Sequence, residues 1–177
     1  MNLIVAVDKN FGIGNGGNLL TYIPEDLEDF KKKTMGKVVV MGRTTLESLP
    51  NKAPLKNRTN IILTRNKSYK VKDAIVVNSL EDLFKVLKNY NSDDIYVIGG
   101  QCIYNKLESY CKFAYVTKIH KVFKADRHFI NIDEDEKWKL EKKGETIISS
   151  SGVSFNFNIY RNIKMLDFTC YYSSKES

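Results

Sequence analysis

Short, continuous apolar runs separated by polar or amphipathic stretches recur along most of the chain. Continuous apolar runs of this length are typical of parallel strands that are covered on both faces. The runs occupy residues 3–7, 38–41, 60–63, 74–77, 95–100 and 114–119. We therefore predict a mainly parallel sheet built from these segments.

The stretches between the runs carry helix signals. Pro24 suits the first position of a helix that reaches about residue 34, with acids in its first turn and lysines in its last. Ser79 is placed to cap another helix, because Asp82 follows three residues later. Further helices are expected at about 44–49 and from 101 to about 110. Strands and helices thus alternate, as in an α/β fold.

The pattern changes after Asp126. Segments near 138–147 and 153–161 alternate apolar and polar positions with a period close to two, as antiparallel strands with one exposed face do. The expected fold class is therefore α/β, with a mixed, mainly parallel sheet that has an antiparallel C-terminal edge and is flanked by helices. The 177 residues show neither an internal repeat nor an interdomain linker, which suits a single domain.

Charge and hydropathy narrow the choice of partners. The formal charge of +7 comes largely from dispersed lysines with acids among them, and a module of interleaved aromatic and basic residues is lacking, so nucleic acid is not an expected partner. A multiply anionic small ligand suits the same charge. The chain has neither an apolar run near the roughly 20 residues of a membrane helix nor the features of a signal peptide. We expect a cytoplasmic protein without a membrane partner.

The cysteines point to reduced thiols. Cys102, Cys111 and Cys170 are odd in number, widely spaced and unaccompanied by histidine clusters. This pattern argues against a disulfide framework and against a zinc site. We expect no bound metal.

Glycines are concentrated after the first apolar run. Gly12, Gly14 and Gly17 have the GxGxxG spacing of a dinucleotide-binding turn, but residues 19–23 separate them from the helix that should follow directly, and no acid ends the next strand. A mobile loop over a ligand site is the favoured interpretation, and a plain surface loop is the alternative.

One acid lies on an apolar helix face. Asp26 shares its face with Ile23 and Phe30. Burial raises the pKa of such a carboxyl unless a hydrogen-bond donor compensates. The group could anchor the cationic or amidine-like edge of a heterocycle, or help to deliver a proton. The alternative is an acid that only stabilises the helix N-terminus.

Polar residues and glycines follow three further predicted strands, where open α/β sheets bind ligands. Residues 42–45, with Arg43 at a helix start, suit a pyrophosphate, and Arg65 beside Thr64 suits an additional 2′-phosphate. The pair Gly99–Gly100 would let the backbone approach a cofactor closely. A capped helix, a solvated arginine and a simple turn are the respective alternatives.

The order and spacing of these motifs resemble dihydrofolate reductase over about residues 1–162. The motifs are LIVAV at 3–7, GIG at 12–14, IPEDLEDFK at 23–31, VVMGRTTLESL at 39–49, NRTNIILTR at 57–65, YVIGGQCIY at 96–104, AYVTKI at 114–119 and ADRHF at 125–129. The resemblance implies a mixed eight-stranded sheet in one domain at 1–162, which reduces dihydrofolate to tetrahydrofolate by hydride transfer from NADPH. Residues 163–177 would then be an extension, whose aromatic content favours an added strand, with a loose tail as the alternative.

The resemblance also implies roles for residues in the matched motifs. Asp26 would bind the pterin edge and promote protonation at N5, Thr117 would hydrogen-bond its carboxylate, and Tyr104 would lie near the reacting carbons; these three are the expected catalytic residues. Arg58 would hold the α-carboxylate of the folate glutamate. The expected substrate-binding residues are Ile4, Val5, Ala6, Leu19, Asp26, Leu27, Phe30, Leu49, Leu55, Arg58, Ile98 and Thr117. The expected cofactor-binding residues are Ala6, Ile13, Gly14, Asn18, Gly42, Arg43, Thr44, Thr45, Leu63, Thr64, Arg65, Gly99, Gly100, Gln101, Cys102, Ile103 and Tyr104.

The chain departs from the family pattern in three places. Leu20 and Thr21 stand where the family usually has proline and tryptophan, so the tryptophan contact with an ordered water is missing and proton delivery is expected to differ. Cys102 and Asn78 stand where basic residues are often found, which leaves the two arginines with more of the phosphate recognition. The third departure is the extension after residue 162.

Two other functions fit parts of the pattern. The reductase domain of riboflavin biosynthesis has a related fold and uses NADPH, but Asp26 in its PEDL setting and Arg58 favour folate. A non-catalytic protein that binds folate or nucleic acid through its basic surface is the second alternative. For a dihydrofolate reductase, the expected partners are dihydrofolate and antifolate-type small molecules, and a monomer is expected.

Overall fold

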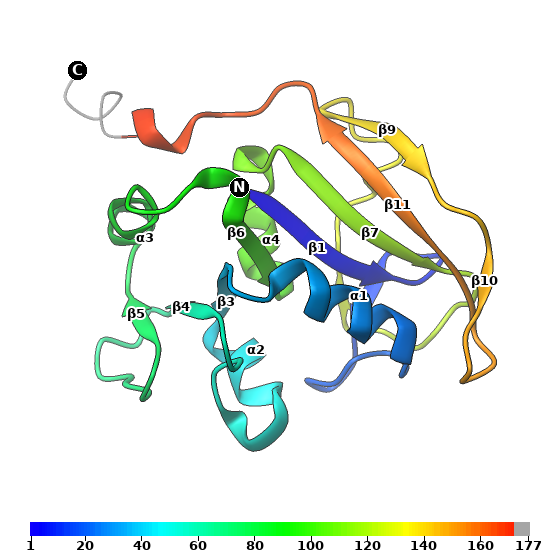
Figure 1. The fold of residues 1–177 in the computed structure, drawn as a ribbon, viewed down its shortest axis with the longest axis horizontal. Coiled ribbons are helices and arrows are strands. Elements are labelled where there is room, and N and C mark those ends of the chain that lie inside the picture. The colour runs from blue at the N-terminus through cyan, green and yellow to red at the C-terminus, as the bar shows by residue number, and fades with distance from the viewer. Residues whose placement is uncertain (172–177) are drawn as a thin grey trace.

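A mixed sheet with helices on both faces forms the centre of the structure, a computed structural model that describes residues 1–171 (Figure 1). The strand order is β10-β11-β7-β1-β6-β3-β4-β5, and β9 pairs with another part of β11, so the sheet is eight strands wide. The strands of this sheet are β1 (Asn2–Val7), β3 (Val38–Gly42), β4 (Thr59–Leu63), β5 (Ile75–Val77), β6 (Ile95–Gly99), β7 (Phe113–Ile119), β9 (Trp138–Lys143), β10 (Ile147–Ile148) and β11 (Ser154–Asn162).

Strand directions confirm the predicted fold class. β1 pairs in parallel with β6 and β7, and β3, β4 and β5 extend the parallel part from β6. β11 runs antiparallel to β7, and β9 and β10 are antiparallel to β11. The sheet is therefore mainly parallel with an antiparallel edge formed by the C-terminal strands.

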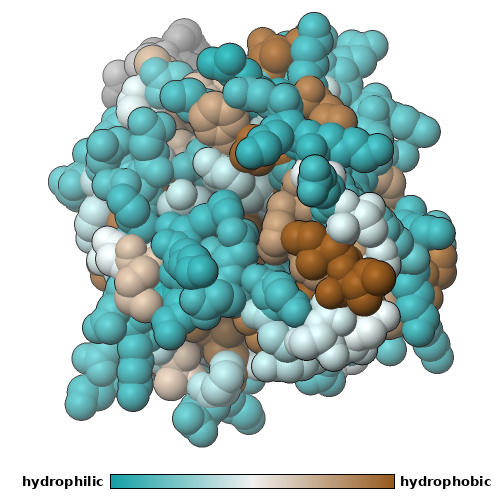
Figure 2. Space-filling view, turned by 45° about the vertical axis from the view of Figure 1, so that its right-hand side comes forward, coloured by the Kyte–Doolittle hydropathy of each residue, from teal (hydrophilic) through white to brown (hydrophobic). Residues whose placement is uncertain are grey.

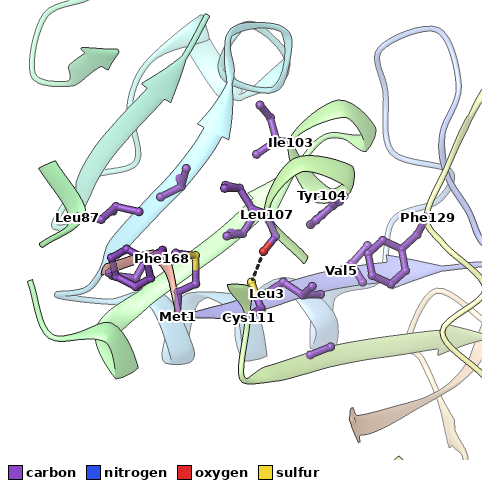
Figure 3. Packing of buried hydrophobic residues seen from close by; sticks show 14 of the residues in the cluster. Met1, Leu3, Val5, Leu87, Ile103, Tyr104, Leu107, Cys111, Phe129 and Phe168 are labelled. Carbon is purple, nitrogen blue, oxygen red and sulfur yellow. Dashed lines mark hydrogen bonds between the residues drawn. The ribbon is translucent and has the colours of Figure 1, made fainter. Parts of the chain in front are cut away.

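Different helices cover the two faces of the sheet. The helices are α1 (Pro24–Thr34), α2 (Arg43–Ser48), α3 (Leu80–Leu87) and α4 (Gln101–Leu107), with short 3-10 turns at Pro50–Lys52, Ser92–Asp94, Glu108–Tyr110 and Phe168–Cys170. α3 and α4 pack on the face to which Leu3 and Val5 of β1 point, and Figure 3 shows these residues close to Leu107 of α4. α2 lies on the opposite face, where its Leu46 packs against Val39 and Met41.

Local signals explain where the helices begin. The Ser79 hydroxyl accepts a hydrogen bond from the backbone N–H of Asp82 at 3.0 Å, so the predicted cap of α3 is confirmed. α1 begins at Pro24, as its sequence indicates, and has no side-chain cap. The buried Ile23 precedes it and packs with Ile119 and Phe155 on the sheet. This contact seats the first turn of α1 against β7.

Part of the glycine-rich loop forms a second, two-stranded sheet that the sequence pattern did not indicate. β2 (Gly12–Gly14) pairs antiparallel with β8 (Arg127–His128). The carboxylate of Asp8, which is 1% exposed, accepts hydrogen bonds from the backbone N–H groups of Gly12 and Phe123. The first half of the loop is thereby tied to the segment after β7, while residues 15–22 form neither a helix nor a named strand.

The described part of the extension docks on α3. Residues 163–171 add no strand to the sheet; they end in a 3-10 turn from which Phe168 packs on Phe84, with ring centroids 5.6 Å apart. The ring of Tyr171 also contacts Phe84, at 4.9 Å. Figure 3 shows Phe168 next to Leu87 and Met1. The expectation of an added strand is therefore not met by residues 163–171, and for residues 172–177 it lies outside the described residues.

The surface in Figure 2 is mostly hydrophilic, with hydrophobic side chains in small separate groups. This face therefore lacks a large continuous apolar area of the kind that marks an extended docking interface. Within residues 1–171, no helix has the length and apolar character required to cross a bilayer.

Candidate active site

Asp26 lies in the first turn of α1 and faces β7. The hydroxyl of Thr117, a residue only 4% exposed, donates a hydrogen bond to Oδ1 of Asp26 at 2.5 Å. The seating of Ile23 on the sheet brings this turn of α1 over β7. The hydrogen bond that the family resemblance implies is thus present.

The surroundings of Asp26 favour its neutral form. Burial raises the pKa of Asp26 above its ordinary value, and the negative charge of Asp29 acts in the same direction. The hydrogen bond from Thr117 and the charge of Lys33 oppose this effect but do not cancel it. Asp26 therefore holds its proton at a higher pH than a solvent-exposed aspartate does.

A pocket opens beside this carboxyl at the junction of the glycine-rich loop, α1 and the sheet. Asp26 is the one acid among the residues that line it, and most of the others are apolar. The lining residues are Ala6, Ile13, Leu19, Leu20, Thr21, Ile23, Asp26, Leu27 and Ile119. An apolar pocket with one protonatable group suits a flat heterocycle that needs a single polar anchor.

Glycines stand at the ends of β3 and β6, where the chain enters α2 and α4. Gly99 has a φ of +107°, and a Cβ there would lie 2.8 Å from Cε2 of Tyr104. A Cβ on Gly42 would lie 3.1 Å from Cγ1 of Ile103, and one on Gly100 would lie 3.4 Å from Oγ1 of Thr45. A larger side chain has no room at Gly99 and little at Gly42, so glycine lets Tyr104 and Ile103 of α4 approach the strand ends closely.

Tyr104 of α4 lies against both β1 and the end of β6. Its hydroxyl donates a hydrogen bond to the carbonyl of Ile4 at 2.7 Å, and burial raises its pKa well above the ordinary value. The phenol therefore stays protonated. Its fixed ring packs closely against Gly99.

The ends of β3, β4 and β6 lie side by side, as a parallel sheet requires. Gly42 is opposite Leu63 in the β3–β4 pair, and Met41 is opposite Gly99 in the β3–β6 pair. Arg43 and Arg65 follow β3 and β4, so both cations stand at the same edge of the sheet. This edge can hold a ligand with several phosphate groups.

The two arginines are held differently. Nη1 of Arg43 contacts both carboxylate oxygens of Glu47 at 2.9 Å, and its guanidinium lies 6.0 Å from the ring centre of Tyr69. Arg65 is exposed. Arg43 thus shares its charge with an acid, whereas the side chain of Arg65 reaches solvent.

A further cation lies at the other end of α1. Nε and Nη2 of Arg58 each donate to the hydroxyl of Thr34 at 3.2 Å, and Nη1 donates to the carbonyl of Lys56 at 2.8 Å. Asn60, which is 2% exposed, exchanges two hydrogen bonds of 2.9 Å with the backbone of Leu55. The loop that carries Leu55 and Arg58 is therefore braced beside α1.

Comparison with known proteins decides the family. Residues 1–162 match the family described as Dihydrofolate reductase. A dihydrofolate reductase of Bacillus subtilis is 39% identical over 140 residues, covering 79% of this chain and 80% of the relative, and one of Staphylococcus haemolyticus is 34% identical over 168 residues, covering 93% and 96%.

The chain belongs to the dihydrofolate reductase family.

The fold agrees with this assignment. The structure of a dihydrofolate reductase from Enterococcus faecalis, complexed with NADP(H) and RAB-propyl, superimposes with a TM-score of 0.82 at 30% identity and covers 92% of this chain and 95% of that chain. The activity is accordingly the reduction of dihydrofolate with NADPH. This excludes the riboflavin-pathway reductase and the non-catalytic binder as the main function.

Several of the side chains expected at the folate site fall into two groups, one that lines the pocket and one that packs under α2. Ala6, Leu19 and Leu27 line the pocket with Asp26. Leu49, Leu55 and Ile98 pack together against the core under α2. Val5 is the exception, because its side chain points to the opposite face and packs with Phe129, as Figure 3 shows. Only its main chain can face a ligand on the Asp26 side.

Sequence reasoning assigned no role to several lining residues. Ile119 lies two positions after Thr117 in β7, so strand periodicity alone puts both on one face and could have identified it. Leu20 and Thr21, noted only as departures from the family, line the pocket directly.

The remaining expectations concern residues away from the pocket. Cys102, Cys111 and Cys170 are free thiols, and Cys102 is exposed at the start of α4. Residues 1–171 contain no group of three or more His, Cys, Asp or Glu that could hold a metal ion. Gln101 uses its side-chain carbonyl to accept from the backbone N–H of His128 at 2.9 Å, which joins α4 to β8.

Proposed function

We propose that Asp26 binds the pterin edge of dihydrofolate and promotes protonation of its N5 atom. The observation that supports this role is the position of Asp26 as the one acid lining an apolar pocket, with its pKa raised by burial. Raising the pKa keeps a larger fraction of the carboxyl protonated near neutral pH, and that fraction is the form able to release a proton.

In this proposal, neighbouring residues fix the carboxyl and exclude water. Thr117 orients Asp26 through its hydrogen bond, so one carboxyl oxygen remains for the pterin. Ile23, Ile119 and Leu20 surround the site with apolar surface, which removes competing solvent. When NADPH is bound, it supplies the hydride. Most of the rate then comes from positioning the reactants in contact.

We assign the cofactor to the edge of the sheet because its residues fit the shape and charge of NADPH. Glycines at the strand ends allow a ligand to come close to the backbone, and the arginines provide positive charge. The proposed cofactor-binding set is the one expected from the sequence, with Arg65 reading the 2′-phosphate. Tyr104, which bonds to the Ile4 carbonyl and packs on Gly99, belongs to the same set.

The folate tail is assigned to the channel between α1 and the loop after α2. Leu27 and Phe30 on α1 are at least partly exposed, and so are Leu49 and Leu55 after α2, so all four can contact a ligand. Arg58, which Thr34 and Lys56 hold in place, would pair with the α-carboxylate of the glutamate.

Loss of NADPH absorbance in the presence of dihydrofolate tests the activity, and Asp26→Asn tests the role of the acid. We expect turnover in the wild type and a loss of about 100- to 10,000-fold in kcat for the variant, which is the usual contribution of a general acid. Calorimetry should show nearly unchanged NADP⁺ binding, because Asp26 contacts the pterin. Unchanged kcat would remove Asp26 from the mechanism.

We further propose that the enzyme acts as a cytoplasmic monomer without nucleic acid. The free state of its cysteines supports a reducing compartment. Light scattering should give a mass near 20.4 kDa. A stable dimer would contradict the monomer.

A further inference from the structure

The side-chain amide of Asn78 contacts the backbone on both sides of Arg65. Arg65 is the exposed cation at the sheet edge to which the cofactor is assigned. Nδ2 of Asn78 donates to the carbonyl of Thr64 at 2.8 Å and to the carbonyl of Asn66 at 3.3 Å. These two residues flank Arg65, so one amide group holds the backbone on both sides of it. Within the same turn, the hydroxyl of Thr64 accepts from the N–H of Asn66 at 3.2 Å.

Asn78 is itself held in a fixed place. It follows β5, whose Val77 pairs with Leu63 of β4 and accepts a hydrogen bond from the N–H of Thr64 at 3.0 Å. The next residue, Ser79, caps α3. A strand on one side and a helix cap on the other leave little freedom for the amide, so it can serve as a rigid support for the Arg65 turn.

The supported turn is strongly basic. Residues 64–72 contain Arg65, Lys67, Lys70 and Lys72 and no acid. On the neighbouring helix α3, the carboxylate of Asp82 accepts a hydrogen bond from the Ser79 hydroxyl at 2.8 Å. A doubly charged phosphate monoester is the ligand group that gains most from a cation presented in this way, because a charge-assisted pair requires a fixed geometry.

We propose that Asn78 is a positioning residue for cofactor selection, which holds the Arg65 turn in the conformation that receives the 2′-phosphate of NADPH. The inference rests on the proposed function of Arg65. Asn78 bears no charge and has no direct role in attracting the phosphate. It lowers the cost of ordering the turn when the ligand binds, and thereby contributes to the preference for NADPH over NADH.

A double-mutant cycle tests this coupling through equilibrium binding of NADP⁺ and NAD⁺, measured by calorimetry. Arg65→Ala is expected to weaken NADP⁺ by about 10- to 100-fold and NAD⁺ far less, as the loss of charge-assisted bonds predicts. Asn78→Ala is expected to weaken NADP⁺ by about 3- to 10-fold and NAD⁺ by less than about twofold. In the Arg65→Ala background, Asn78→Ala should add almost nothing.

Asn89→Ala is the matched control. The amide of Asn89 also donates to two backbone carbonyls, those of Lys85 and Val86, but at the far end of α3. Its loss should leave the ratio of NADP⁺ to NAD⁺ affinity unchanged. Asn78→Ser, which keeps a short donor, should give an intermediate ratio, and it replaces Asn78→Ala if that variant does not fold.

Equal loss of both cofactors in Asn78→Ala, or an undiminished effect of Asn78→Ala in the Arg65→Ala background, would overturn the inference. Equal loss of both cofactors in Arg65→Ala would overturn it too, because the turn would then not read the phosphate. Each result is distinguishable from a failure of the proposed function, since wild-type turnover of dihydrofolate is measured separately and requires no variant.

Discussion

At the scale of single residues, the account depends on the environment of Asp26. The sequence pattern placed this acid on an apolar helix face, and the structure supplies the partner that the pattern lacked, the Thr117 hydroxyl 2.5 Å away. Burial outweighs that hydrogen bond, so the pKa of Asp26 is raised. A raised pKa in an apolar pocket is the property expected of a proton donor.

This raised pKa predicts a pH-dependent stability cost. A carboxyl that binds its proton more tightly in the folded protein makes folding less favourable as pH rises from the ordinary value of 3.8 through the raised folded pKa. Asp26→Asn removes the titrating group. We expect the free energy of unfolding of the variant, measured with urea and relative to wild type, to increase as pH rises from about 4 to 8. A difference that is the same at every pH would show that Asp26 titrates normally.

The sequence predicts the role of a residue more readily when that role depends on the helix or strand that carries it. Roles that depend on contacts with distant parts of the chain are harder to predict. Asp26 and Ile119 follow from helix and strand periodicity within their own elements. The support that Asn78 gives to Arg65 spans 14 residues, and the bond from Thr117 to Asp26 spans 91. Only the resemblance to a family indicated the second of these, and nothing in the pattern indicated the first.

At the scale of elements, α1 is fastened at both ends. At its first turn, the Glu25 carboxylate accepts from the Ser149 hydroxyl at 2.5 Å and from the N–H of Ser150 at 2.8 Å, in the turn between β10 and β11. At its last turn, the hydroxyl of Thr34 accepts a hydrogen bond from the guanidinium of Arg58. The local sequence pattern gives no sign of the Glu25 contacts, because its partners lie more than 120 residues away in the chain.

The Glu25 link predicts an acid-sensitive contribution to stability. The hydrogen bond from Ser149, followed by that from Ser150, lowers the pKa of Glu25 to about 2 from 4.5. A lowered pKa gives stability that is present above 4.5 and is lost as pH falls toward about 2. Glu25→Gln should therefore unfold at a lower temperature than wild type at pH 6, with a difference that shrinks toward pH 2.

Glu28→Gln is the control for this experiment. Glu28 is on the same helix, in a solvent-exposed pair with Lys32 at 3.6 Å. Such pairs contribute little to stability, so Glu28→Gln should follow wild type at every pH. If both variants show the same unfolding temperatures at each pH, Glu25 does not fasten α1 to the turn between β10 and β11.

The glycine-rich segment contains a short strand that its sequence does not predict. Its glycines and small residues indicated a loop, and residues 15–22 are one, but Gly12–Gly14 pairs with Arg127–His128. A strand of three residues has too few positions for a periodic pattern, and its partner is more than 100 residues away. Short pairings of this kind depend on the tertiary fold and leave no local signal.

At the scale of the whole molecule, the parallel order of strands brings four separate motifs to one edge of the sheet. The fold class was predictable because continuous apolar runs imply parallel strands, and this prediction is confirmed. The course of the extension was not predictable, because its aromatic residues fit a strand as well as a docked turn. The structure packs Phe168 on Phe84 of α3. The short turn that carries Phe168, red in Figure 1, lies apart from α1.

This arrangement predicts that the extension stabilises the enzyme without taking part in the reaction. Phe168→Ala should lower the free energy of unfolding by about 3 kcal/mol, because it removes a buried ring from a packed site. Its kcat at a temperature where the variant is folded should equal that of wild type. Met165→Ala, at a side chain 46% exposed on the same segment, is the control and should change stability little. A drop in kcat for Phe168→Ala would connect the extension to the active site.

The most direct test of the central claim is the pH dependence of kcat/KM for dihydrofolate in wild type and Asp26→Asn at saturating NADPH. We predict that the wild-type value falls as pH rises through the raised pKa of Asp26, and that this inflection is absent in the variant, whose lower activity depends on protons from solvent. The same inflection at the same pH in both proteins would contradict the account, because another group would then govern proton delivery.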